Sequence, residues 1–117
     1  MPVPTVDDPQ VIVGHQEGRP AFEIHTNGSG EASGFTQFVD FEGGEEKTRI
    51  FPHTFVSEEF NGKGLASALV RRALDSSIKE GFTIVPVCPY VKSWIHKHPE
   101  YEEFSTSVTP EHLKALG

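Results

Sequence analysis

The sequence predicts an α+β fold in which an antiparallel meander of about four strands precedes a glycine turn, an amphipathic helix, a further strand and short C-terminal helices. The first observation behind this prediction is a change of period. The first half alternates β-branched and aromatic segments with turn residues, whereas apolar residues follow helical spacing from Gly64 onward. The second observation is the glycine pair Gly62 and Gly64 at the junction. A strand, a glycine turn and a helix start therefore follow one another there.

Pro- and Asp-rich residues open the chain without periodicity, so residues 1–10 are expected to form an irregular N-terminal arm. We expect residues 11–117 to form a single domain, because 117 residues suffice for one core. The strands of the meander are predicted at residues 11–15, 21–26, 32–41 and 47–56. Turns rich in Gly, Asn and Pro separate them, and the first two strands are expected to form a hairpin.

The second half begins with a predicted amphipathic helix over residues 64–80, followed by Gly81 as a left-handed C-cap. The next strand, residues 83–88, is reached by a crossover and is expected to lie parallel to the strand before the helix. Pro86 within it removes a ladder donor, so it is expected on an edge or where neighbouring strands have parted. Helices are then predicted from Pro89 to about Lys97 and over residues 111–116.

The charge balance limits the class of partner. The net charge is −7, from 17 Asp and Glu against 10 Lys and Arg, which makes nucleic acid or an anionic membrane an unsuitable partner and favours a cationic or amine-bearing one. The chain has no apolar run of membrane-spanning length and no signal-peptide pattern at its N-terminus. Its single cysteine, Cys88, excludes an internal disulfide. We therefore expect a cytoplasmic protein.

The glycine turn has the chemistry of an anion site, because the first N–H groups of a helix lack intrahelical partners and the helix dipole favours negative charge. A P-loop has the pattern Gly-x-x-x-x-Gly-Lys-Ser/Thr. It is excluded here, because Gly64 and not Ser or Thr follows Lys63, and the upstream glycine of the pattern is absent. The dinucleotide fingerprint fits poorly, since the turn follows an antiparallel meander. A pyrophosphate site and a plain strand–helix turn remain as the two interpretations.

The segment Asn61–Ala66, between a strand and an amphipathic helix, resembles the Gln/Arg-x-x-Gly-x-Gly/Ala signature of the GCN5-related N-acetyltransferases. Asn61 departs from that signature, because it stands where Gln or Arg is usual. The resemblance extends to His53–Thr54, to Val85–Val91 with its Cys-Pro pair, and to the His-Pro-Glu-Tyr run at His98–Tyr101. The resemblance covers roughly residues 11–104. The additional motifs look like those of a small subfamily of abbreviated acetyltransferase-like domains.

The resemblance implies acetyl-CoA as the cofactor, bound where two parallel strands splay apart, and an amine as the acceptor. The residues that it assigns to pyrophosphate and pantetheine are Thr54, Phe55, Val56, Asn61, Gly62, Lys63, Gly64, Leu65 and Ala66. Most members of the family insert two helices between their first strands, whereas the short turn Asn27–Gly30 leaves no room for them here. The acceptor side is therefore expected to be open, which favours an exposed amine such as a protein lysine or terminus.

Three side chains are candidates for catalysis. Cys88 precedes a proline-initiated helix, where unpaired amides would favour its thiolate as a nucleophile; a buried structural cysteine is the alternative. His53 is a candidate base on either side of the sheet, or a packed or surface strand residue. Tyr101 lies roughly where relatives carry a tyrosine that protonates the leaving thiolate, and a core aromatic is the favoured alternative. No metal site is predicted, because no ligand set has suitable spacing.

The leading functional hypothesis is an acetyl-CoA-dependent N-acetyltransferase of reduced size. The rival is a non-catalytic acyl-CoA-binding or regulatory module, supported by Asn61 and the missing acceptor helices. An interaction domain that binds no CoA is the third hypothesis. The sequence leaves the acceptor, the acyl group and the oligomeric state open.

Overall fold

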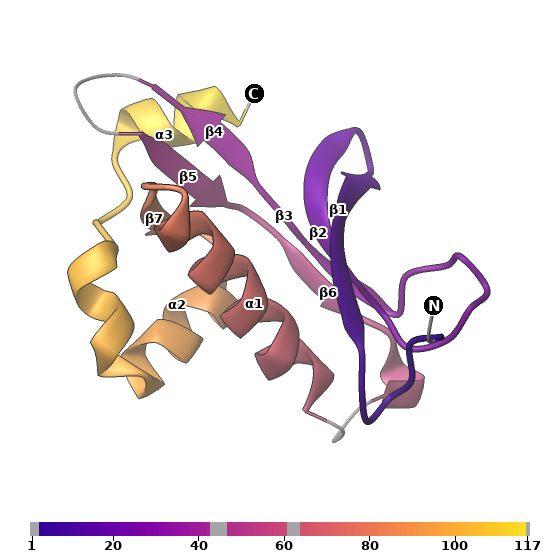
Figure 1. Ribbon diagram of the computed structural model, residues 1–117. Coiled ribbons are helices and arrows are strands. Elements are labelled where there is room, and N and C mark those ends of the chain that lie inside the picture. The colour runs from indigo at the N-terminus through magenta and orange to yellow at the C-terminus, as the bar shows by residue number, and fades with distance from the viewer. Residues whose placement is uncertain (1–2, 43–46, 61–63, 117) are drawn as a thin grey trace.

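The computed structural model of the chain describes residues 3–42, 47–60 and 64–116 (Figure 1). The described strands form two sheets, of order β1-β2-β3-β6 and β4-β5-β7. Their bounds are Gln10–Gln16 for β1, Arg19–His25 for β2, Gly34–Gln37 for β3, Val39–Phe41 for β4, Thr48–Phe51 for β5, Thr54–Val56 for β6 and Thr83–Pro86 for β7. The predicted α+β class is confirmed.

The meander is antiparallel from β1 to β6, as the turn residues predicted. The β1–β2 hairpin closes through Glu17 and Gly18, which both have positive φ, of 53° and 82°. Two positive φ angles in a two-residue loop are what the right-handed twist of paired strands requires.

The predicted strands 32–41 and 47–56 are each broken in two, and the second break contains an extra residue. Thr36 pairs with Thr54 and Val39 with Ile50, so two residues on one strand face three on the other. Pro52 supplies the extra residue, because it cannot donate to the ladder and a bulge accommodates that loss. The bulge reverses the alternation of side chains between β5 and β6.

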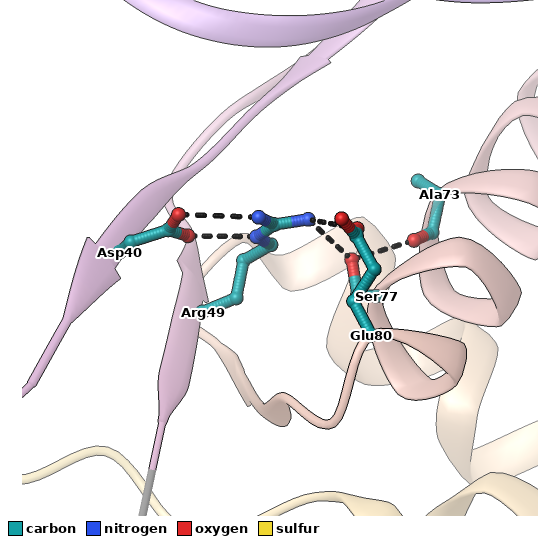
Figure 2. A network of polar contacts seen from close by, with 5 residues as sticks. All are labelled: Asp40, Arg49, Ala73, Ser77 and Glu80. Atoms are coloured by element: carbon teal, nitrogen blue, oxygen red, sulfur yellow. Dashed lines mark hydrogen bonds and ion pairs between the residues drawn. The ribbon is translucent and has the colours of Figure 1, made fainter.

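Helix α1, Leu65–Lys79, lies against the sheets (Figure 1). Its buried residues Leu69, Val70 and Leu74 belong to the core. Its C-terminal end is tied to β4 and β5 by the buried guanidinium of Arg49, which bonds to the side chains of Asp40, Ser77 and Glu80 (Figure 2). The helix therefore has a fixed position on the sheet.

Strand β7 pairs in parallel with β5 and forms one end of its sheet, as the crossover predicted. Pro86 is the last residue of this edge strand, a position at which a missing N–H is tolerated. The strand ends two residues earlier than predicted. Beyond it, the N–H of Cys88 donates to the oxygen of Phe51 at 2.8 Å.

The C-terminal part contains α2 at Pro89–Lys97 and α3 at Pro110–Ala115, both close to their predicted bounds. Two 3₁₀ helices were not predicted, η1 at Glu58–Phe60 and η2 at Pro99–Phe104. A hydrogen bond of 2.9 Å from Trp94 Nε1 to Ser67 Oγ ties α2 to the first turn of α1.

Candidate functional site

Strands β6 and β7 part immediately after the Pro52 bulge, and we call this separation the splay. Phe51 is the last residue that β5 pairs with β7, whereas β6 belongs to the other sheet and forms its edge. The hydrogen bond from Cys88 to Phe51 lies at the closed end of the splay. The predicted parting of the strand before the glycine turn from the strand after the helix is therefore present.

The free edge of β6 offers backbone groups at alternate residues. Gln37 N–H donates to His53 O and Ser57 N–H donates to Ser33 O, both at 2.8 Å, on either side of the Phe35–Phe55 pair, so residues 53, 55 and 57 direct their backbone groups toward β3. In an antiparallel ladder the intervening residues point their N–H and C=O groups to the other side. Thr54 and Val56 therefore present backbone groups to the splay, and Phe55 does not.

The N-terminus of α1 lies beyond β6 and carries open amides. Gly64, its N-cap, adopts a left-handed conformation with φ 75° and makes no side-chain cap bond, and among the described residues no atom beyond its chain neighbours lies within 4 Å of where a Cβ would stand. The first helical bond runs from Ala68 N to Gly64 O, so the N–H groups of Leu65, Ala66 and Ser67 have no intrahelical partner. The predicted residues Asn61, Gly62 and Lys63 lie outside the described part of the chain.

Cys88 directly precedes the proline-initiated helix α2, as predicted; it is the N-cap of that helix, and its side chain lies in the apolar core. The residue is only 5% exposed. Its backbone is fully engaged, since its N–H bonds to Phe51 and its oxygen accepts from Lys92 N–H at 3.0 Å. The thiol is thus positioned at the closed end of the splay and shielded from water.

His53 lies on the opposite face of the sheet, because the bulge turns it away from α1. Phe51, two residues earlier, is buried in the α1 core, whereas His53 is exposed and packs edge-on against Phe35 at 5.8 Å. The side chain of Cys88, in contrast, lies in the α1 core. The two candidates flank the splay from different sides.

Tyr101 lies on η2, which follows the C-terminal end of α2, whereas Cys88 precedes its N-terminal end. Its hydroxyl donates to Asp75 Oδ1 at 2.6 Å and accepts from Arg71 at 3.3 Å, and its ring belongs to the core. Burial raises the pKa of Tyr101, and the hydrogen bond to Asp75 raises that pKa further. This environment is that of a core aromatic with a satisfied hydroxyl.

A cavity lies between β7, α2 and the segment that follows η2. Its volume is about 970 Å³, and Pro86, Lys92, His96 and Glu102 are among its lining residues. Among the described residues, neither Gly64 nor β6 contributes to its lining. In the described parts of the chain, no three His, Cys, Asp or Glu side chains gather as metal ligands, and no helix is long and apolar enough to cross a membrane.

Sequence reasoning missed Pro52 as a determinant of the site. The bulge there creates the free edge of β6 and orients His53, and the signal was a proline inside a predicted central strand.

Comparisons with known proteins agree with the sequence resemblance. The sequence pattern of the family described as GCN5-related N-acetyl-transferase matches residues 21–104. Protein NATD1 from Danio rerio is 29% identical over 93 residues, covering 78% of this chain and 81% of that protein. Protein NATD1 from Xenopus tropicalis is 26% identical over 89 residues, covering 76% and 78%.

Two solved structures are similar in fold. One, a GCN5-like putative N-acetyltransferase from Staphylococcus aureus, has a TM-score of 0.56 at 18% identity, over 86% of this chain and 93% of that one. The other, a ribosomal-protein-alanine N-acetyltransferase from Brucella melitensis biovar Abortus 2308, has a TM-score of 0.53 at 21% identity, over 80% of this chain and 66% of that one. At these identities the likeness concerns the fold.

Proposed function

Because the chain belongs to the GCN5-related N-acetyltransferase family, whose members transfer acetyl groups, we propose that it uses acetyl-CoA to acetylate an exposed amine, such as a protein lysine or terminus. The observation that carries this proposal is the junction of β6 and α1. There a free strand edge leads to a helix whose first amides are open at Gly64.

The residues at this junction fit the chemical groups of the cofactor. The N–H groups of Leu65 and Ala66, at the positive end of the α1 dipole, suit a pyrophosphate, and Gly64 lets it approach the backbone. The outward backbone groups of Thr54 and Val56 suit the amides of the pantetheine arm. We also assign Asn61, Gly62 and Lys63 to the pyrophosphate, on the resemblance. Bound acetyl-CoA supplies the acetyl group activated as a thioester.

The chain itself must prepare the amine, because only a neutral amine is nucleophilic. We assign proton removal to His53, whose exposed ring lies beside the splay on the face not covered by α1. Cys88 is our candidate for accepting the acetyl group covalently, since its thiol lies at the closed end of the splay. We leave Tyr101 out of the mechanism, because its hydroxyl already donates to Asp75.

Calorimetry with CoA and acetyl-CoA, together with release of free CoA thiol in the presence of lysine peptides, tests the proposal. Gly64→Glu should abolish binding, because it places bulk and negative charge at the open amides. Gly81→Ala is the matched control, since it changes a positive-φ glycine at the other end of α1. Absence of binding at millimolar ligand by the unmodified protein would refute the proposal.

The covalent role of Cys88 has its own test. Incubation with acetyl-CoA followed by intact mass measurement should show one acetyl adduct that Cys88→Ala abolishes. Thiol release that persists in Cys88→Ala without an adduct would show direct transfer to the amine and would leave Cys88 a structural residue.

A second candidate function is a non-catalytic acyl-CoA-binding module. The burial of Cys88 and its separation from His53 favour it. CoA binding without thiol release, across N-terminal and lysine peptides, would identify this function.

A further inference from the structure

The sheet β1-β2-β3-β6 has a second face, which points away from α1 and which we call the outer face. Phe22 and Ile24 of β2 lie in the α1 core, so the alternating residues Glu23 and His25 point to the outer face. Glu23 pairs across the sheet with Phe35, and Phe35 pairs with Phe55. A carboxylate and two aromatic rings thus form one row that ends at the splay.

The aromatic part of the row consists of a buried ring, Phe35, and an exposed ring, Phe55, beside the proposed base. The rings of Phe35 and Phe55 lie 5.6 Å apart, and His53 packs against Phe35 at 5.8 Å. Phe55 is 47% exposed, although it lies on a strand beside the core. The exposed ring of Phe55 can contact a cationic side chain that approaches the candidate catalytic histidine.

The carboxylate of Glu23 is held in one place. Gln16 Nε2 donates to its Oε2 at 2.7 Å, and His25 Nε2 lies 3.2 Å from its Oε1. A Cβ on Gly14 would stand 2.8 Å from the carboxyl group, so the glycine leaves the space that the carboxylate occupies. The side chain of Glu23 stays 14% exposed, and each oxygen retains capacity for another donor.

The arginine on the same strand as Glu23 is engaged elsewhere. Arg19 lies on the same strand and face, but its guanidinium donates to Gln37 Oε1 at 3.3 Å and to Leu116 O at 2.7 Å. The chain carries a net charge of −7. The outer face therefore offers a fixed negative group behind an aromatic surface, which is complementary to a cation.

We propose that the outer face receives a dibasic acceptor: a peptide whose reacting amine lies at the splay beside His53 and whose second cationic side chain crosses Phe35 to reach Glu23. Two strand spacings separate Glu23 from β6, so the two amines would stand about 10 Å apart. The reacting amine can lose its proton at His53 while the second keeps its charge at Glu23. This inference rests on the proposed function and names its substrate class.

The test uses heptapeptides with one reacting lysine and a second position, three residues away, occupied by lysine, norleucine or glutamate. With the full-length protein, the second lysine should raise kcat/KM about tenfold over norleucine. Glu23→Gln should remove that preference, so that the ratio of kcat/KM between the lysine and norleucine peptides falls to about one. Glu103→Gln, which removes an exposed carboxylate on η2, is the matched control and should keep the preference.

Peptide binding without acetyl-CoA separates this inference from the proposed function. Calorimetry or chemical-shift changes at Phe35 and Phe55 should show tighter binding of the dilysine peptide, whether or not transfer occurs. An unchanged unfolding midpoint in Glu23→Gln would exclude a folding defect. Equal binding of the lysine and norleucine peptides, or a lysine preference that survives in Glu23→Gln, would overturn the inference.

Discussion

The two ends of α1 are built in opposite ways. At the C-terminal end, Gly81 and Phe82 donate to Ile78 and Ser77, each at 3.0 Å, which closes the helix with its carbonyls satisfied. At the N-terminal end, Gly64 provides no side-chain cap. One end therefore has its backbone groups satisfied within the chain, and the other leaves amides available to a ligand.

The C-terminal end of α1, which we call the sealed end, also holds the helix to the sheet. Arg49 makes two bonds to Asp40, at 2.7 and 3.1 Å, and further bonds to Ser77 and Glu80 (Figure 2). Its guanidinium stacks on Phe82 at 4.0 Å. Anchoring at this end keeps the open end in place without using the amides that a phosphate needs. The difference teaches that stability and binding are assigned to separate ends of one helix.

Replacing Arg49 should have the largest effect on stability. Arg49→Met removes four polar bonds and leaves Ser77 and Asp40 without their partner, so we expect a loss of about 3 kcal/mol in the free energy of unfolding. Urea denaturation measures it, with Arg72→Met on the exposed side of α1 as a control that should change stability by less than about 0.5 kcal/mol. Equal losses in the two variants would mean that the Arg49 network does not anchor the helix.

Gly64→Ala and Gly81→Ala sharpen the comparison directly. Both glycines have positive φ, of 75° and 90°, and within the described part of the chain no atom beyond their chain neighbours lies closer than 3.8 Å to where a Cβ would stand. Each variant should lose about 1 kcal/mol of stability through backbone strain. Only Gly64→Ala should weaken acetyl-CoA binding in calorimetry, and similar weakening by Gly81→Ala would refute the division between the ends.

Ser77→Ala removes a smaller part of the network at the sealed end than Arg49→Met does. Ser77 is fully buried, donates to Ala73 O at 2.7 Å and accepts from Arg49 at 3.2 Å. Its loss leaves the bonds from Arg49 to Asp40 intact, so the unfolding free energy should fall by about 1 kcal/mol. Thermal unfolding measures the change, with the half-buried Ser76→Ala as the control. A loss as large as that of Arg49→Met would show that Ser77 is the dominant anchor.

The smallest expected effect is on the pH dependence of stability, through Tyr101, whose hydroxyl bonds to Asp75 of α1. Burial raises the pKa of Tyr101 above 10, and its bond to Asp75 adds to the shift. The folded state therefore holds the proton more tightly than the unfolded state, so this stabilisation is complete below about pH 10 and is lost as the pH rises through the folded pKa. Absorbance at 295 nm should show Tyr101 ionising above pH 10 in the folded protein and near 10 in urea. Tyr101→Phe identifies its contribution, since Tyr90 also has a raised pKa.

The sequence predicted most elements because their signals are local. Spacing of apolar residues, Gly81 and the proline at 89 defined α1 and α2 within about two residues. The Pro52 bulge depended on which strands pair with Thr48–Val56, and a single strand pattern does not contain that information. The side of the sheet that His53 faces was therefore left open by the sequence. The single domain over residues 11–117 stays a prediction.

In β6, alternate residues point their backbone N–H groups away from β3, and this affects amide exchange with solvent. The amide of Phe55 is bonded within the sheet and should exchange slowly, whereas those of Thr54 and Val56 face the free edge and should exchange fast. The exchange rate of the Phe55 amide is thus an internal reference for the rates of the Thr54 and Val56 amides. A molecule occupying the free edge would slow the outer two and leave the central one unchanged, which gives its position along the strand without a label or a substitution.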